Sequence, residues 1–280
     1  MCPRSGPTLA QPHIAQPSGR GLASGAVTTP RGASAPPRVR DRLRAAADGP
    51  LAVVHAGRHA VYVNVDGWCV GVVGPGASRL PCALRVTDIR EILGDSTRVR
   101  LTAYLGGGKL HIGGIPLPIH RLVGAYVPPL GVGATRQTGP VTVQATPPAT
   151  VARFVDSQLP SGHIDAEAAT RLFGRGEGLT PLGDDVLAGW HAMHRAAGVP
   201  TPEVDAAVGT APDRTTLLSA TLLDCARHGE VLPEYAAWVR AVGTDTEPAA
   251  VRALQGVGAT SGAGLHAGGR LALGQLRAAA

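Results

Sequence analysis

The sequence predicts an α+β protein in which a small antiparallel β-rich domain precedes a mostly α-helical domain. Short β-branched segments, separated by Gly- and Pro-rich turns, occupy residues 51–112. Ala- and Leu-rich segments with helical spacing occupy residues 149–277. Pro147-Pro148 separates the two patterns. The expected divisions are a disordered Arg/Pro/Gly-rich extension (1–48), a β-rich domain (49–146) and a helical domain (147–280).

The strand predictions depend on alternation and on turn chemistry. Residues 60–65 and 68–73 alternate and are β-branched, and Asp66-Gly67 between them is a typical hairpin dipeptide. Glycines at 106–108 separate two further segments. The expected strands are 51–54, 60–65, 68–73, 83–86, 98–105 and 110–112.

The helix predictions depend on apolar spacing and on Ala and Leu content. In the segment from 184 to 197, one apolar stripe contains Trp190 and His194, while Asp184 and His191 share the opposite side. This spacing predicts a packed histidine at 194. The expected helices are 149–157, 165–173, 184–197, 213–228, 233–242, 247–256 and 262–277.

The positive charge is concentrated at the start of the chain. The 26 basic and 20 acidic side chains give a net charge of +6, and residues 1–50 contribute +5 through seven Arg and two Asp. The remaining chain is close to neutral. The first 40 residues also lack a periodic apolar pattern, which is typical of a segment without a stable fold. Nucleic-acid binding by the folded part is therefore not expected.

Several function classes are excluded by composition and motif. Aromatic residues make up 3% of the chain, too few for a base-stacking surface. Lys109 is the single lysine, so a Walker-type phosphate loop is absent. No apolar stretch approaches the roughly 18 residues that a membrane span needs. Cys2, Cys69, Cys82 and Cys225 have no zinc-site spacing, and with no secretory signal we expect reduced thiols and a cytoplasmic protein.

The segment from 174 to 185 is the densest candidate for chemistry. Glycines at three alternate positions permit positive φ and close ligand approach. Thr180-Pro181 suits an N-cap and first helical position, where free N–H groups could hold an anion. The Asp184-Asp185 pair has two interpretations. Acidic residues at a helix start are favoured by capping and by the dipole, but they could also bind a cation, orient a polar substrate or act as a base.

Two later segments also place polar side chains at the start of an expected helix. Thr215, Thr216 and Ser219 open one helix after Asp213, where capping is the simpler interpretation. A Gly-rich turn with Thr260, Ser261 and Gly262 precedes the last helix and suits an anion or a carbonyl oxygen. His266 follows within that helix, where we expect it to be solvated.

The run Gly178 to Asp185 reads G-L-T-P-L-G-D-D and is followed by Leu187-Ala188-Gly189. It resembles the signature G-L-T-P-S-G-D-D-x-L-x-G of the AllH-like family, mostly uncharacterised bacterial proteins that include AllH, a subunit of oxamate carbamoyltransferase. Thr215-Thr216 with Ser219 resembles the second block of the family, and residues 258–262 resemble the third. The resemblance covers about 50–277.

The resemblance implies a carbamoyltransferase-like enzyme or enzyme subunit that acts on a small anionic amide or carbamoyl phosphate. Companion subunits are implied as partners, and no cofactor is established, although Mg²⁺ would suit the aspartate pair. Asp184 and Asp185 would then be catalytic or metal-binding. The implied substrate-binding positions are Gly178, Thr180, Gly183, Thr215, Thr216, Ser219, Thr260, Ser261 and Gly262.

A second hypothesis is a non-catalytic small-molecule-binding or regulatory subunit that keeps the family pocket. Leu182 replaces the usual Ser of the signature, and Ala259 replaces the usual His of the third block. Ala263 and Gly264 stand where an acidic residue is usual. A third hypothesis, nucleic-acid binding through the Arg-rich residues 1–45, would predict salt-sensitive binding.

Overall fold

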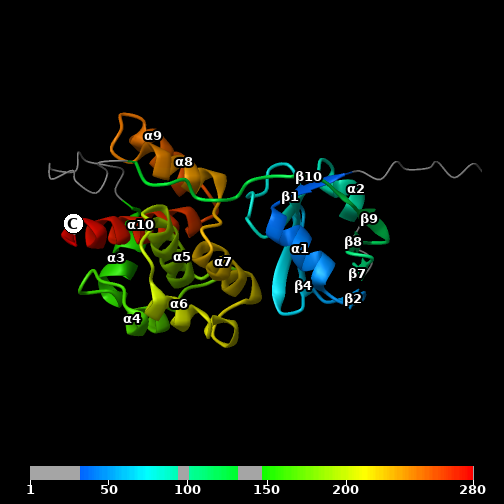
Figure 1. Cartoon of the computed structure of the whole chain (residues 1–280), viewed down its shortest axis with the longest axis horizontal. Helices are drawn as coiled ribbons and strands as arrows, with labels where there is room; N and C mark the ends of the chain where they lie inside the picture. Colours follow the sequence, from blue (N-terminus) through cyan, green and yellow to red (C-terminus); the bar gives the residue numbers. More distant parts are fainter. Residues whose placement is uncertain (1–31, 94–100, 132–146, 280) are drawn as a thin grey trace, which may run out of the picture.

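The computed structural model describes residues 32–93, 101–131 and 147–279, which form two lobes (Figure 1). An N-terminal lobe holds the strands and two helices, and a helical lobe follows. The elements of the N-terminal lobe are β1 (Ala33–Ala35), α1 (Pro37–Ala45), β2 (Gly49–Leu51), β3 (Val53–Gly57), β4 (Ala60–Val65), β5 (Trp68–Val73), β6 (Ala83–Arg85), α2 (Ile89–Leu93), β7 (Ala103–Gly106), β8 (Lys109–Ile112), β9 (Ile115–Leu117) and β10 (Ile119–Leu122).

The N-terminal lobe contains two sheets. One has the strand order β10-β1-β6-β5-β4-β3, and the other has the order β2-β7-β8-β9. The β4–β5 hairpin confirms the sequence prediction: Asp66 and Gly67 have φ values of 49° and 76°, and the Asn64 side chain accepts a hydrogen bond from Gly67 N at 2.8 Å. The α+β class is confirmed. The second sheet is antiparallel as expected, but the first is mixed, because β5 pairs with β6 and β1 with β10 in parallel.

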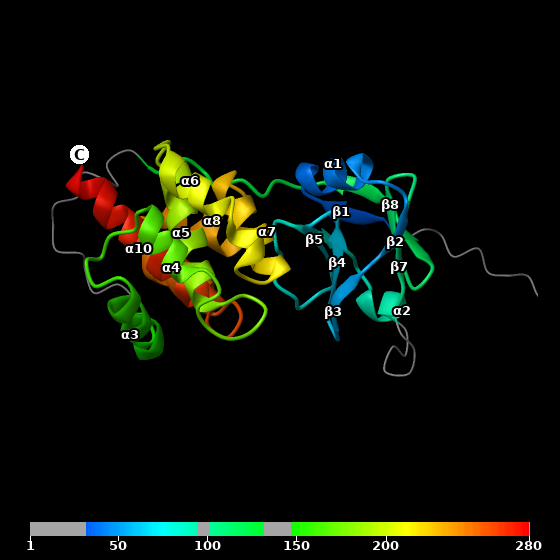
Figure 2. The ribbon, with the colours of Figure 1, turned by 90° about the horizontal axis from the view of Figure 1, so that it is seen from below.

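Residues 33–45 correct the expectation of an extension without fold, because they form β1 and α1. The sequence of α1 is rich in Arg, so its two apolar side chains did not form a recognisable helical pattern. Helix α1 lies along the strands of the N-terminal lobe (Figure 2). Its Val39 and Leu43, four residues apart, are fully buried in the core that includes these strands, while its arginines are only partly buried or exposed. The earlier part of the predicted extension, residues 1–31, lies outside the described residues.

The helical lobe is built around α5, against which α10, α7 and α4 pack. No side of α5 is left to solvent, so Asp184 and His191, which the spacing places on the side opposite Trp190, are buried as well. The helices of this lobe are α3 (Ala149–Gln158), α4 (Ala166–Leu172), α5 (Leu182–Ala196), α6 (Pro202–Val208), α7 (Leu217–Arg227), α8 (Pro233–Ala241), α9 (Glu247–Gln255) and α10 (Ser261–Ala278), with a short 3₁₀ turn at Ala211–Asp213. Helix α6 was not predicted from the sequence, although Thr201-Pro202 repeats the Thr-Pro pair that precedes α5.

Glycines allow α5 and α10 to approach closely. A Cβ on Gly189 would come within 2.0 Å of the Leu265 carbonyl oxygen, and one on Gly268 within 1.8 Å of the Val186 carbonyl oxygen. No larger residue fits at either position without moving backbone. This contact brings the start of α10 beside the start of α5, although about 80 residues separate them in sequence.

A segment after β10 connects the lobes and is hydrogen-bonded to the helical lobe (Figure 1). Val127 N donates to Gly229 O, Val231 N donates to Ala125 O, and Leu130 N donates to Ala196 O, each at 2.7 Å. These bonds fix the segment between α7 and α8 to the connection. Within the described ranges, no helix is both long enough and apolar enough to span a membrane.

Candidate functional site

A cavity of about 220 Å³ lies where the two lobes meet. Tyr62, Ser78, Leu80 and Pro81 line it from the N-terminal lobe, while residues before α5, before α10 and around the α7–α8 connection line it from the helical lobe. Among its lining residues the carboxyl groups belong to Asp185 and Glu230, and none is Arg, Lys or His. The cavity is therefore mostly apolar, with a few polar groups that can orient a small ligand.

Asp184 is buried, with 1% of its surface exposed, and both of its carboxyl oxygens are satisfied within the protein. Gly174 N donates to Oδ1 at 3.1 Å, and the Thr215 hydroxyl donates to Oδ2. Burial raises the pKa of Asp184, and the hydrogen bonds from Thr215, Gly174 and Ser219 oppose that rise only in part. Asp184 thereby ties the glycine loop before α5 to the start of α7.

Asp185 differs from its neighbour in that its carboxyl group lines the cavity and is not fully satisfied. It is 5% exposed, and its Oδ2 is buried without a hydrogen-bond partner among the described residues. Burial raises its pKa well above the usual aspartate value, and Asp184 raises it further, while hydrogen bonds from the Ser261 and Thr180 side chains lower it. A neutral Asp185 carboxyl can donate a hydrogen bond to a ligand.

Thr180 and Ser261 join the two motif blocks at the cavity. Their hydroxyl oxygens are 2.9 Å apart, and both residues line the cavity beside Asp185. The predicted cap is shifted by one residue, because Pro181 is the N-cap of α5 and Thr180 lies before it. The Thr180 hydroxyl is consequently directed to the start of α10 instead of to its own helix. A Cβ on Gly264 would lie 2.9 Å from Asp185 Cβ, so this glycine allows the close approach of the two helices here.

The other predicted positions lie around this group but do not line the cavity. Thr216 caps α7, because its hydroxyl accepts a hydrogen bond from Ser219 N at 3.1 Å and donates to Leu179 O at 2.6 Å. Thr260 is the exposed N-cap residue of α10 and Gly178 is exposed in the loop before α5. A Cβ on Gly183 would come within 2.2 Å of Leu172 O, and one on Gly262 within 1.8 Å of Leu254 O.

The aspartate pair does not suit a divalent cation. Within the part of the chain that the structure describes, no three His, Cys, Asp or Glu side chains gather at one point. Mg²⁺ requires ionised or carbonyl oxygen ligands with several open positions. Both oxygens of Asp184 already accept hydrogen bonds, and burial disfavours the ionised form of both aspartates.

Three buried histidines of the helical lobe, His191, His194 and His266, are packed in the interior and have lowered pKa values. His194 is buried as predicted, and its Nδ1 lies 3.0 Å from Trp190 O. His266 corrects the expectation of a solvated side chain, because it is 2% exposed and packs edge-on against Trp238. Burial lowers the pKa of both His191 and His266 to about 4, although Asp205 raises that of His191.

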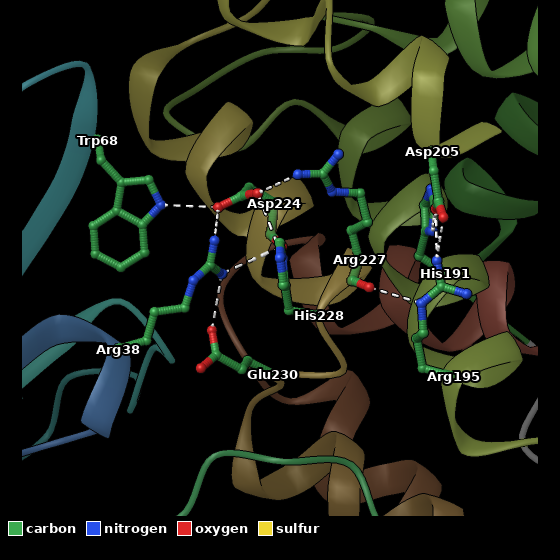
Figure 3. Close-up of polar contacts among 9 residues, drawn as sticks. All are labelled: Arg38, Trp68, His191, Arg195, Asp205, Asp224, Arg227, His228 and Glu230. Atoms are coloured by element: carbon green, nitrogen blue, oxygen red, sulfur yellow. Dashed lines mark hydrogen bonds and ion pairs between the residues drawn. The ribbon is translucent and has the colours of Figure 1, made fainter. Parts of the chain in front are cut away.

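Sequence reasoning missed the lining residues that lie outside the three motif blocks. Glu230 is buried in the cavity lining and accepts a hydrogen bond from Arg38 of α1 at 3.1 Å (Figure 3). Tyr235, another lining residue, donates to Gly189 O at 2.6 Å. Arg38 lies 192 positions from Glu230, so no local pattern could have linked them.

Comparison with known proteins places the similarity in the helical lobe. No curated protein and no solved structure matches the chain. The matched segment runs from the end of α4 into α10 and contains the three blocks that the sequence analysis singled out. Residues 172–273 match the family described as oxamate carbamoyltransferase subunit AllH.

Proposed function

We propose that this chain is a carbamoyltransferase-like enzyme or enzyme subunit, and that the cavity between its lobes binds a small amide-containing anion. Asp185 carries the proposal, because the residue lines the cavity and its buried Oδ2 has no hydrogen-bond partner among the described residues. An unsatisfied buried polar atom is costly to folding, and such a cost is typical of functional sites. The family match of residues 172–273 supports the reaction class.

The chemistry of Asp185 follows from its environment. At neutral pH its raised pKa favours a protonated carboxyl, which donates a hydrogen bond to a carbonyl or carboxylate oxygen of the ligand. The same group, once ionised, would accept a proton from an amide nitrogen as that nitrogen bonds to the carbonyl carbon of carbamoyl phosphate and the C–O bond to the departing phosphate breaks. Thr180 and Ser261 would contact substrate oxygens beside it.

Negative charge on the ligand would be accommodated by helix ends. The starts of α5 and α10 both reach the cavity, through Thr180 and Ser261 respectively. Helix N-termini carry partial positive charge and favour an anion. Since no cationic side chain belongs to the lining, a singly charged carboxylate suits this cavity better than a dianion does.

Asp184 is proposed as a positioning residue for the same site. Its two hydrogen bonds hold the loop at Gly174 and the start of α7 at Thr215, on either side of the signature. Replacement by Asn would place its Nδ2 against either the Gly174 N–H, where two donors meet, or the Thr215 hydroxyl, which would then have to accept instead of donate. We therefore expect Asp184→Asn to lower stability, and to affect ligand binding only through that loss.

The proposal is tested by ligand-induced thermal shift and by calorimetry with oxamate, followed by an assay of phosphate release from carbamoyl phosphate plus oxamate. Asp185→Asn should abolish the oxamate-induced shift while the protein stays folded by circular dichroism. Glu177→Gln, an exposed carboxyl-to-amide change in the same loop, is the matched control and should bind as the unaltered protein does. If Asp185→Asn binds oxamate with unchanged affinity, the proposed site is wrong.

The second candidate is a binding or regulatory subunit without turnover. It is favoured by Leu182, which replaces the Ser of the signature and contacts Gly264 of α10 instead of supplying a hydroxyl. Companion subunits, implied by the description of the family as a subunit, decide between the two. Oxamate binding without phosphate release, in the presence of those subunits, would support the second candidate.

A further inference from the structure

A second cavity, of about 340 Å³, lies at the same lobe interface and has the opposite character. Its lining contains three arginines, of which two come from α1 and one from the end of α7. Its other polar lining residues are Trp68 of β5 and Thr221, Asp224 and His228 of the helical lobe. The cationic residues are Arg38, Arg42 and Arg227. Figure 3 shows most of these side chains converging from both lobes.

Asp224 is the centre of the cluster and its carboxylate is saturated. Arg38 donates to Oδ2, Trp68 Nε1 donates to Oδ2 at 3.1 Å, and Arg227 donates to Oδ1 at 3.1 Å. Burial acts to raise the pKa of Asp224, but Arg38 and the Trp68 hydrogen bond outweigh it, so the pKa lies below the usual aspartate value. Asp224 is therefore ionised at neutral pH and has little capacity for another donor.

The cluster nevertheless has an excess of guanidinium groups. Arg38 forms a second ion pair, 3.1 Å long, with Glu230, which lies outside this cavity. Arg42 forms no ion pair among the described residues, and its guanidinium lies 5.5 Å from the centre of the Trp68 ring. Arg227 has a buried Nε without a hydrogen-bond partner in the same part of the chain. Three guanidinium groups thus face two carboxylates.

We propose that this cavity is an anion site for a phosphate group, either free or at the end of a small phosphorylated molecule. Arg42 and Arg227 would hold its oxygens, since planar guanidinium groups match phosphate geometry with paired N–H donors. This inference depends on the lining alone and does not require the activity proposed for the first cavity.

The ligand would also affect the lobe interface. Arg38 bonds Asp224 in the cationic cavity and Glu230, which lines the first cavity. An anion beside Arg38 therefore lies one ion pair away from the amide-binding cavity. Because both lobes supply donors, bound phosphate should stabilise their contact and raise the melting temperature.

The test is calorimetric titration of the full chain with inorganic phosphate and, separately, with glycerol phosphate. Saturable binding is expected for at least one, and comparison of the two identifies free phosphate or a phosphate ester as the better ligand. Arg42→Gln should weaken binding about tenfold or more, and so should Arg227→Gln, because each removes charged hydrogen bonds. Affinity should also fall as salt rises.

Two control variants separate binding in this cavity from general attraction of phosphate to a basic chain. Arg40→Gln, on the same helix but paired with Asp41 outside the cavity, should bind phosphate as the unaltered protein does. Asp185→Asn should also leave phosphate binding unchanged, which distinguishes failure of this proposal from failure of the amide site. No saturable binding by the unaltered protein, or equal loss in Arg40→Gln and Arg42→Gln, would overturn the inference. Arg42 forms no ion pair among the described residues, so its replacement should leave the fold intact.

Discussion

The two cavities at the lobe interface handle buried acidic groups in opposite ways. Around Asp185, no cation is present in the lining, and burial favours the neutral carboxyl. Around Asp224, guanidinium and indole donors surround the carboxylate and keep it ionised. The same residue type is therefore disfavoured as an anion in one cavity and held as an anion between the lobes in the other. The two carboxyl groups differ in protonation because guanidinium and indole donors surround Asp224, whereas no cationic side chain lines the cavity at Asp185.

The largest effect on stability is expected when the Asp224 carboxylate is removed from the charged cavity. Asp224→Asn should lower the free energy of unfolding by about 3 kcal/mol, because Arg38 and Arg227 lose their shared anion in a partly buried site. Denaturant unfolding followed by circular dichroism measures the change. Glu234→Gln is the control, since Glu234 forms a more exposed ion pair at the same interface. A loss equal to that of the control would mean that the cluster does not hold the lobes together.

Asp185→Asn should change the free energy of unfolding in the opposite direction to Asp224→Asn. Because the ionised carboxyl is disfavoured by burial, the isosteric amide should raise the free energy of unfolding by about 2 kcal/mol at neutral pH, while ligand binding is lost. Stability and oxamate binding are measured on the same preparation. The gain should shrink as pH falls toward the usual aspartate pKa, since the native carboxyl is then protonated in both folded and unfolded chains. A destabilised variant would contradict this account of Asp185.

The buried histidines should make the stability of the helical lobe depend on pH. His191 and His266 have folded pKa values of about 4, below the ordinary value, so the unfolded chain binds more protons between about pH 6.5 and pH 4. Stability should therefore fall as pH decreases through that window. His266→Gln should remove about 1 kcal/mol of the loss between about pH 7 and about pH 5.5. Thermal unfolding at a series of pH values tests this, and an unchanged slope would show that His266 titrates normally.

The smallest effect is expected at the exposed edge of the interface. Arg79 and Glu234 lie 3.4 Å apart and are both partly exposed, so Arg79→Gln should change stability by less than about 0.5 kcal/mol. Its effect on oxamate and phosphate binding should be negligible. A loss comparable to that of Asp224→Asn would indicate that exposed contacts, instead of the buried cluster, secure the lobes.

Alternation, helical periodicity and turn residues predicted the β4–β5 hairpin and the main helices of the helical lobe. The β4–β5 hairpin follows from alternation and from Asp66-Gly67, and its strands begin and end at the expected residues. The main helices of the second lobe follow from Ala- and Leu-rich periodicity. In contrast, α1 escaped prediction because only the adjacent strands make its Val39 and Leu43 a buried face.

The candidate site was predictable only in part. The motifs indicated that Asp185, Thr180 and Ser261 belong together, and the glycine contacts of α5 and α10 explain why they meet. No sequence pattern distinguishes Asp184 from Asp185, because their difference depends on Gly174 and Thr215 reaching only the first. The arginine cluster is likewise invisible in sequence, since it joins α1 to residues near the end of α7.

The central claim is that Asp185 is a buried, neutral carboxyl poised to bind a ligand, and it is tested most directly by its own titration. In protein labelled with ¹³C at aspartate Cγ, Asp185→Asn identifies the Asp185 signal by its disappearance. Our account predicts that this signal stays in the protonated position well above the usual aspartate pKa, and that saturating oxamate shifts it. An Asp185 signal that titrates near the ordinary aspartate pKa of 3.8, or that does not respond to oxamate, would contradict it.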